Sequence, residues 1–417
     1  MLKRALLSIF LLASCPYTGQ QPSPPVPPGG HVEVVKSPDG WRLMVNGKPF
    51  FVKGMCLGLS KVGESAHENT QRDWMDVDDD HNGRNDFAYQ AWVDTNRNNQ
   101  RDPGEAEIGD FQLWKDMGVN AVRFYHHPSA DPEIQAINPG KILMNHAPNK
   151  KLLRELYQKF GIRVAMADLL GAYAVGSGAP WDPGTDYRDK AQRANMLKSV
   201  AAMVKDFKDE PYILMWMLGN ENNYAKYTHT NAEQYPEEYA KFVNEAAKLI
   251  HSLDPHHPVC LVNGGKQFLD VYAKHAPAVD IFGLNDYKMF DFGNLWSDVA
   301  GVYDKPVLLT EFGTGYPPIE NGILREDKQA AVHKSCWLDI ARHAAGKQTP
   351  GNSIGGFVFV WLDDWWQSGN PLAHDIAKDG WSFEWNGMAG QGDGTQSPFL
   401  RELRKVYSTY KDLWQGN

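Results

Sequence analysis

The chain has 417 residues, of which 42% are hydrophobic and 12% aromatic, and its formal net charge is −9 at pH 7. This length and composition suffice for one large domain or two ordinary ones with a buried core, and they exclude a disordered chain. Much of the negative charge lies between residues 72 and 107, where ten acidic side chains face four basic ones. Because no basic stripe accompanies it, we do not expect nucleic acid as a partner.

Residues 1–15 have the pattern of a secretory signal. Lys3 and Arg4 precede an apolar stretch too short for a permanent membrane span, and the stretch ends in LASC at Cys15. This ending resembles the lipobox of bacterial lipoproteins, in which the Cys is lipidated after cleavage. The Pro-rich residues 16–30 predict a semi-rigid tether. We expect an exported protein anchored in a bacterial cell envelope through a lipid on Cys15, or otherwise a secreted protein with an ordinary signal.

The remaining residues, 31–417, predict one domain. Turn signals in SPDG and NGK predict a small hairpin before a buried strand at Phe51–Leu57. An acidic insert at residues 60–108 follows this strand, and seven more strand-like runs then alternate with helical segments. The further strands are expected at Val119–Tyr125, Ile162–Asp168 and Tyr212–Leu218, and from Pro258, Val279, Pro306 and Phe357. The main helices are expected at Asp110–Met117, Asn149–Phe160, Arg188–Phe207, Glu237–Leu253, Lys328–His343 and Phe399–Leu413.

The fold class follows from these runs. Short, fully apolar strands are buried on both faces, and strands that alternate with helices pair in parallel through right-handed crossovers. Eight such units predict an α/β protein with a closed (β/α)8 TIM barrel. A doubly wound open sheet is the alternative, but it usually has a Gly-rich phosphate turn after its first strand, and KGMCLGLS is not one.

Two of the apolar runs break off at a glutamate. LMWMLGNEN contains Glu221 after the fourth expected strand, and VLLTEFGTG contains Glu311 at the end of the seventh. In a closed barrel both carboxylates face the same mouth. Such a pair can cleave a β-linked glycan, one as acid and the other as nucleophile, when the two carboxyl groups lie roughly 5 Å apart. Burial and the neighbouring charge should raise the pKa of one above that of the other.

Several motifs resemble the catalytic barrel of the retaining β-glycosidases, and most closely glycoside hydrolase family 2. NGKPFFVKG resembles the first-strand entry of that family, and GVNAVRFYHHP resembles its second-strand motif, with Arg123 and His126 in the family positions. WMLGNEN and LTEFG are similar to the fourth-strand and seventh-strand motifs. The resemblance implies Glu221 as acid/base beside Asn220, which bonds the sugar 2-hydroxyl. It implies Glu311 as the nucleophile.

Three further substrate contacts are implied by the resemblance. GLNDY places Tyr287 where the family has a Tyr bonded to the nucleophile, and FVWLDDWW places Trp361 on the floor of the sugar subsite. AMADLLG supplies Asp168 but lacks the Glu that often follows in the family, so the identity of the sugar stays open.

Two other functions are compatible with the same residues. GVNAVRFY and TEFG are also similar to motifs of the fungal β-1,3-glucanosyltransferases, which use the same chemistry but exclude water as acceptor. A non-catalytic carbohydrate-binding barrel at the cell surface is the other. His126 and His127 indicate no metal, because no spaced carboxylate or third His accompanies them. The cysteines of the mature chain, Cys56, Cys260 and Cys336, are expected as buried free thiols.

The acidic insert contains two loops with oxygen ligands at alternate positions, the pattern of calcium-binding loops. The ligands expected in the first pattern are Asp94, Asn96, Asn98, Gln100, Asp102 and Glu105. The ligands expected in the second are Asp78, Asp80, Asn82 and Asp86, with Gly83 at the sixth position. Tyr89 replaces the final Glu of the second loop, and Asp76 is a substitute ligand. We expect structural calcium here, and no cofactor for catalysis; the alternative is a solvated acidic loop.

Overall fold

The computed structural model describes residues 30–140, 145–313, 319–320, 323–367, 369–374 and 383–416. The expected signal with Cys15 and nearly all of the Pro-rich tether lie outside these ranges. Within the described ranges, no helix combines the length and the apolar character that crossing a membrane requires.

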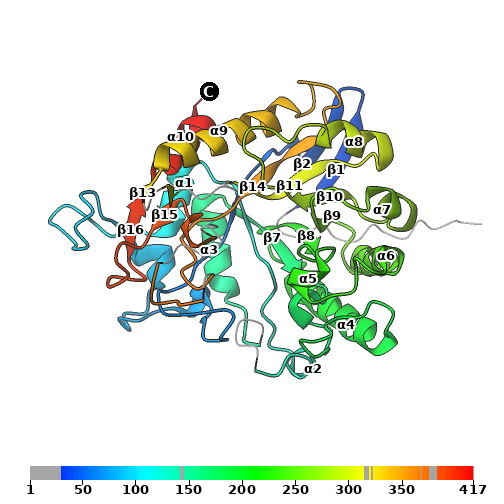
Figure 1. Cartoon of the computed structure of the whole chain (residues 1–417), viewed down its shortest axis with the longest axis horizontal. Helices are drawn as coiled ribbons and strands as arrows, with labels where there is room; N and C mark the ends of the chain where they lie inside the picture. The colour runs from blue at the N-terminus through cyan, green and yellow to red at the C-terminus, as the bar shows by residue number, and fades with distance from the viewer. Residues whose placement is uncertain are drawn as a thin grey trace, which may run out of the picture.

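Eight parallel strands form a closed barrel in which the chain order is also the spatial order (Figure 1). The strands are β4 (Val52–Cys56), β6 (Ala121–Arg123), β7 (Arg163–Asp168), β8 (Ile213–Leu218), β9 (Val259–Gly264), β10 (Ile281–Asn285), β11 (Val307–Phe312) and β14 (Ser353–Val358). The TIM-barrel prediction is therefore confirmed. The eighth strand is the one most displaced from its expected place, since it begins four residues before Phe357.

Helices follow the strands. They are α1 (Asp110–Met117), α2 (Pro132–Gln135), α3 (Lys150–Phe160), α4 (Lys190–Phe207), α5 (Ala225–Thr228), α6 (Pro236–Leu253), α7 (Leu269–His275), α8 (Leu295–Val302), α9 (Glu326–Arg342) and α10 (Lys405–Gln415). The longer helices cover the outside of the barrel, whereas the short α5 lies at its mouth. The closing helix was expected from Phe399, and this start is wrong. Residues Leu400–Leu403 form strand β16 instead, because they pair with two other short strands.

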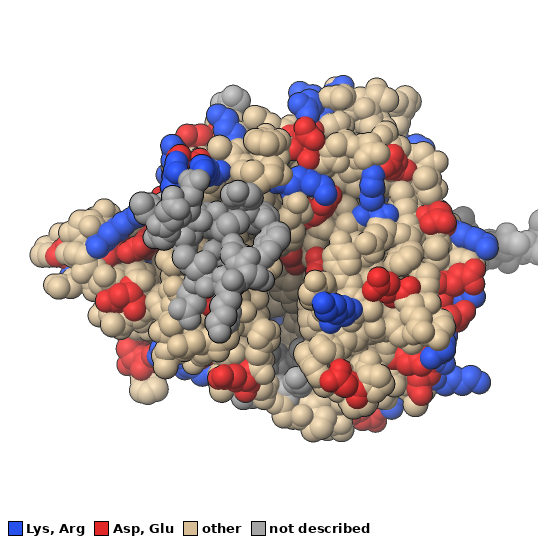
Figure 2. All heavy atoms as spheres, in the orientation of Figure 1, with Lys and Arg blue, Asp and Glu red and all other residues tan. Residues whose placement is uncertain are grey.

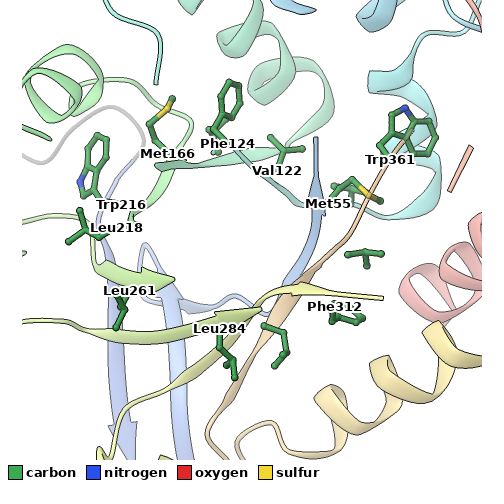
Figure 3. Packing of buried hydrophobic residues seen from close by; sticks show 14 of the residues in the cluster. Met55, Val122, Phe124, Met166, Trp216, Leu218, Leu261, Leu284, Phe312 and Trp361 are labelled. Atoms are coloured by element: carbon green, nitrogen blue, oxygen red, sulfur yellow. The ribbon is translucent and has the colours of Figure 1, made fainter. Parts of the chain in front are cut away.

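Alternate residues of each strand serve two different cores. In β7, Val164 and Met166 belong to the large cluster between the strands and the helices, whereas Ala165 and Ala167 belong to the cluster inside the barrel. Figure 3 shows outward-facing members of the large cluster from several strands. Small residues suit the barrel interior, where side chains from all strands converge. The same alternation decides which polar side chains at the strand ends reach the mouth.

The N-terminal strands close the bottom of the barrel. The strands β1 (Val32–Ser37), β2 (Gly40–Val45) and β3 (Lys48–Pro49) form a small antiparallel sheet, as the turn signals predict. Val32 and Leu43 pack into the interior cluster, and the N–H of Val32 donates to the carbonyl of His256, just before β9. Because this contact lies at the N-terminal ends of the strands, the opposite end is left for the site.

The acidic insert is joined to the C-terminal part of the chain. Its strand β5 (Trp92–Val93) pairs with β16, which also pairs with β15 (Ala389–Gly390). In Figure 1, β15 and β16 lie beside α1 at one side of the barrel. Arg401 on β16 and Asp110 on α1 form an ion pair of 2.8 Å in which both side chains are fully buried. The insert is therefore part of the barrel domain.

Charges on the surface are mixed. On the face in Figure 2, the described Lys and Arg side chains are scattered among Asp and Glu and form no continuous basic stripe. The three cysteines, Cys56, Cys260 and Cys336, are buried and free, as predicted.

Candidate active site

Glu221 and Glu311 line one cavity of about 1000 Å³ at the C-terminal ends of the barrel strands. Glu311 belongs to β11, and Glu221 follows β8 by three residues. The sequence prediction that both carboxylates reach the same mouth is confirmed. The cavity is much larger than one sugar ring, so its walls contact more than the bond to be cleaved.

Glu221 lies on a sharp turn. Its φ is 57°, in the left-handed region, and it follows Gly219, whose φ is 82°. A Cβ at Gly219 would come within 2.4 Å of Oδ1 of Asn222, so only glycine fits there. Asn222 supports the turn by accepting from the N–H of Asn220 at 2.7 Å and donating to the hydroxyl of Tyr187 at 2.7 Å. A strained backbone held by buried hydrogen bonds is common at functional sites.

Glu311 is held by three donors. Arg123 donates to its Oε1 at 2.9 Å, Tyr125 donates to the same oxygen at 2.9 Å, and Tyr287 donates to Oε2 at 2.6 Å. Arg123 is fully buried, so its charge acts on Glu311 with little screening. Glu311 thus accepts from one cation and two hydroxyl groups, which fix the orientation of its carboxyl group. The predicted contact between Tyr287 and this glutamate is confirmed.

Glu221 has the opposite environment. Burial and the charge of Glu311 raise the pKa of Glu221 to about 7, although Asn285 and Arg123 partly oppose the shift. Glu311 therefore has three hydrogen-bond donors, one of them a cation, while Glu221 keeps its proton toward neutral pH. This division between two adjacent carboxyl groups matches the acid and nucleophile roles of a glycosidase.

Arg123 also positions Asn220. Its Nη2 donates to Oδ1 of Asn220 at 2.7 Å, and Nδ2 of Asn285 donates to the same oxygen at 3.2 Å. The amide nitrogen of Asn220 is thereby turned toward Tyr173, whose hydroxyl lies 3.4 Å away, and both residues line the cavity. Asn220 thus presents a donor to the cavity, beside Glu221.

His126 lines the cavity, as predicted. The N–H of Leu169 donates to its Nδ1 at 3.2 Å, and its buried Nε2 has no partner among the described residues. Burial lowers the pKa of His126 to about 3, so the ring is neutral and Nε2 carries the hydrogen. His126 therefore offers an unused donor.

The sequence prediction for Asp168 as a substrate contact is wrong. Asp168 is fully buried outside the cavity, where it accepts from Ser199 Oγ at 2.6 Å and lies 3.5 Å from Nε2 of His127. Along β7, Asp168 lies on the same side as Val164 and Met166, so its side chain points out of the barrel toward the helices. Burial opposes its ionisation, but His126, His127 and Ser199 lower the pKa of Asp168 to about 2.

This placement also corrects the statement that no carboxylate accompanies the histidine pair. His126, His127 and Asp168 each offer a ligand atom, and these atoms lie within 4.8 Å of one another. Nδ1 of His126 and both oxygens of Asp168 already have protein donors, however. Because these ligand atoms already accept hydrogen bonds from the protein, the cluster fits a structural hydrogen-bond network better than a metal site.

The prediction for Trp361 is also wrong. The strand ends at Val358, and the fully buried Trp361 turns outward to pack against Trp114 and Tyr407, with ring centroids at 6.0 and 6.2 Å (Figure 3). Phe359 lines the cavity in its place, and its ring meets Tyr287 edge-on at 6.1 Å.

Sequence reasoning missed other residues that the strand alternation would have indicated. Tyr125 follows Arg123 by two residues, and Asn285 precedes Tyr287 by two, so each pair points to the same side. The cavity also contains Asp364, which the sequence analysis did not single out, and a rim of exposed aromatic residues that includes Trp181 and Tyr227.

The two loops of the insert have the same local geometry. In one, Asp78 accepts from the N–H groups of Asn82 and Gly83 at 3.0 and 2.9 Å. In the other, Asp94 accepts from Asn98 and Asn99 at 3.2 and 2.8 Å. The third and fifth residues of each loop accept in the same way. Each of these side chains accepts from the backbone N–H two residues later: Asp80 from Asn82, Asn82 from Arg84, Asn96 from Asn98 and Asn98 from Gln100.

The loop at Asp78 brings its carboxylates together. Asp78, Asp80 and Asp86 offer oxygens within 4.8 Å of one another, and the buried Oδ1 of Asp86 has no partner among the described residues. Tyr89 is not part of this cluster, because its hydroxyl bonds Glu155. Residues Asp86–Gln90 form one π-helical turn, which moves Gln90 to the cluster. Its Nε2 donates to Asp80 at 2.8 Å, and its buried Oε1 has no partner in the part of the chain that the structure describes.

Asp76, expected as a substitute ligand, lies elsewhere. It groups with Asp73 and His146, and it accepts from Asn149 at 3.3 Å. In the loop at Asp94, Asp102 accepts from the amides of Asn96 and Asn98, at 2.7 and 2.9 Å. Glu105 of that loop accepts from Thr95 at 2.7 Å and from the N–H of Asp102 at 3.0 Å. The loop at Asp78 thus has more unused ligand oxygens than the loop at Asp94.

Residues 104–337 match the model of the glycosyl hydrolases family 2 TIM barrel domain, which is more than half of the chain. The chain belongs to glycoside hydrolase family 2. A β-glucuronidase of Streptococcus agalactiae is 27% identical to this family 2 chain over 234 residues, 51% of the chain and 33% of that protein. The chain thus spans about a third of the length of this relative.

Solved structures agree on the fold. A β-D-glucuronidase of Dictyoglomus thermophilum superposes with a TM-score of 0.52 at 16% identity, over 93% of this chain and 54% of that one. A family 2 β-galacturonidase of Eisenbergiella tayi superposes with a TM-score of 0.51 at 15% identity, over 93% of this chain and 54% of that one. At these identities the likeness concerns the barrel alone.

Proposed function

We propose that this family 2 chain is a retaining β-glycoside hydrolase, with Glu221 as acid/base and Glu311 as nucleophile. The observation that supports this most is the contrast between the two carboxyl groups in one cavity. Arg123, Tyr125 and Tyr287 donate hydrogen bonds to Glu311, while burial and the charge of Glu311 raise the pKa of Glu221 to about 7.

The reaction has two displacements. In the first, Glu311 attacks the anomeric carbon, and Glu221 gives its proton to the leaving glycosidic oxygen. In the second, Glu221 takes a proton from water, which attacks the anomeric carbon and releases Glu311. The donor of Asn220 lies beside Glu221, where it can bond the sugar 2-hydroxyl, and His126 Nε2 can bond a further hydroxyl.

The test uses aryl β-glycosides and variants of both glutamates. Glu311→Gln should abolish turnover. Glu221→Ala should slow turnover most for substrates with poor leaving groups, and added azide should restore it with formation of a β-glycosyl azide. Full activity of Glu311→Gln would contradict the proposal and favour a non-catalytic carbohydrate-binding barrel.

A β-glucanosyltransferase with the same catalytic pair is the second candidate. The cavity volume and its exposed rim favour it, because Trp181 and Tyr227, with 49% and 70% of their surface exposed, can stack on an acceptor sugar. Mass analysis of products from β-glucan oligosaccharides separates the two activities. Products longer than the substrate indicate transfer, and only shorter ones indicate hydrolysis.

We also propose structural calcium in both loops of the insert. The unpartnered oxygens of Asp86 and Gln90 support it for the loop at Asp78, and the matching backbone geometry supports it for the loop at Asp94. Calcium prefers six to eight oxygen ligands, which alternate residues of such loops supply. Chelation should lower the thermal stability of the protein, and an unchanged melting temperature with EDTA would contradict the proposal.

Export and lipid attachment at Cys15 remain a proposal from the sequence. The LASC pattern after a short apolar stretch supports it. Metabolic labelling with a fatty acid should mark the wild-type chain, whereas Cys15→Ala should be unlabelled. An unlabelled wild-type chain recovered from the medium would indicate an ordinary secretory signal.

A further inference from the structure

A third carboxyl group, that of Asp364, lies in the cavity beside the catalytic pair. Asp364 follows β14, and only 5% of its surface is exposed. A Cβ placed on Gly58 would lie 2.8 Å from its Oδ1 and 2.6 Å from Val360, so the carboxyl group fills space that this glycine leaves after β4. Asp364 is therefore held in the cavity wall.

The neighbouring Asp363 is a structural carboxylate of the same loop, with a cation and a backbone N–H as partners. Asp363 is fully buried, and it accepts from Nη1 of Arg404 at 2.9 Å and from the N–H of Gly387 at 2.9 Å. Within the described chain, Asp364 has no such cation. Burial and the charge of Asp363 raise the pKa of Asp364 to about 7, with a smaller contribution from Glu311, although the side chains of Trp366 and Gln367 partly oppose the shift. A buried carboxyl group with no cation beside it among the described residues is costly to the fold, which suggests that a ligand uses it.

The cations of the cavity are already committed or lie at its rim. Among the described residues that line it, Arg123 is bound to Glu311 and Asn220, and Arg72 pairs with Glu64 and Asp79. Lys226 is exposed. A sugar carboxylate deep in this cavity would meet Glu221, Glu311 and Asp364 with no uncommitted Arg or Lys from the described walls. Burying such an unpaired anion is costly.

We propose that Asp364 is a substrate-binding residue that bonds the hydroxyl groups of an uncharged sugar, so that this site selects neutral β-hexosides over β-uronides. The inference rests on the proposed glycosidase function and names its substrate class. A hydroxyl group can donate to a carboxylate and accept from a carboxylic acid, so it fits Asp364 in either protonation state. The carboxylate of a uronate is repelled by the ionised form of Asp364. The relatives described above are named for uronic acid substrates, and this cavity differs from what such a substrate needs.

The experiment compares 4-nitrophenyl β-glucoside, β-galactoside and β-mannoside with the β-glucuronide and β-galacturonide. In the wild type, kcat/KM for the best neutral substrate should exceed that for either uronide by at least about 100-fold. Asp364→Asn keeps the shape and removes the charge. It should lower kcat/KM for the neutral substrate by about 10-fold or more. The ratio of kcat/KM for the neutral substrate to kcat/KM for the uronide should fall by a similar factor. The exposed Asp209→Asn serves as the matched control and should leave both quantities unchanged.

A second measurement covers the case in which Asp364→Asn does not fold. Neutral sugars should inhibit the wild type more strongly than D-glucuronate or D-galacturonate. Faster cleavage of a uronide than of every neutral substrate, tighter inhibition by a uronate, or an unchanged ratio in a folded Asp364→Asn would overturn the inference. In each of these cases, loss of activity in Glu311→Gln would still support the glycosidase function. Failure of the substrate-class inference can therefore be distinguished from failure of the proposed function.

Discussion

Tyr287 donates a hydrogen bond of 2.6 Å to Oε2 of Glu311, on the side opposite the guanidinium of Arg123. Tyr287→Phe removes this donor to a charged group and should lower kcat/KM by about 10-fold to 100-fold, equivalent to about 1.5 to 3 kcal/mol. Steady-state kinetics with an aryl β-glycoside measures the loss. Tyr212→Phe is the control, because the buried hydroxyl of Tyr212 has no partner within the described ranges and its removal should leave the kinetics unchanged.

The raised pKa of Glu221 predicts the alkaline limb of the pH profile. The acid role requires the protonated form, so kcat/KM should fall as the pH rises through about 7. Glu221→Gln should remove this limb along with most of the activity on substrates with poor leaving groups. A profile that stays flat up to pH 9 in the wild type would exclude Glu221 as the acid.

The same pKa also predicts how stability changes with pH. The pKa of about 7 in the folded chain lies above the ordinary glutamate pKa of 4.5, so between these pH values the folded chain binds more protons than the unfolded chain. The contribution of Glu221 to the free energy of unfolding therefore falls as the pH rises from about 4.5 to 7. Urea denaturation at several pH values should show a shallower fall for Glu221→Gln than for the wild type.

Two substitutions test the finding that Phe359, and not Trp361, lines the cavity. Trp361 is fully buried in the core, so Trp361→Ala should destabilise the fold by about 3 to 5 kcal/mol. Phe359→Ala should instead raise KM with a smaller loss of stability, because Phe359 lines the cavity. Denaturant unfolding and kinetics on both variants separate these effects. Substrate binding that depends on Trp361 and is indifferent to Phe359 would contradict the assignment.

The parts of the site that the sequence predicts are those where a residue follows directly from a strand end. Glu221, Glu311, Arg123 and Tyr287 belong to motifs attached to strands with clear apolar runs. The error at Asp168 arises because an apolar run does not show which alternate residues of a strand face inward. The error at Trp361 arises because the eighth strand already ends at Val358, so Trp361 lies in the loop beyond it. Asp364 was missed for another reason: it lies in a loop, and its role depends on Gly58, over 300 residues earlier in the chain.

The insert gives the last contrast between sequence and structure, and it can be tested at two adjacent residues. The spacing rule assigns the final ligand position of the loop at Asp78 to Tyr89, whereas the π-helical turn brings Gln90 to the carboxylate cluster. Gln90→Ala should weaken calcium binding at this loop by about 10-fold or more, measured by calorimetry or terbium luminescence. Tyr89→Phe loses only the hydrogen bond to Glu155 and should leave calcium affinity unchanged. Ligation by Gln90 would be ruled out if its removal left the affinity intact, and weakened binding in Tyr89→Phe would restore the simple twelve-residue loop.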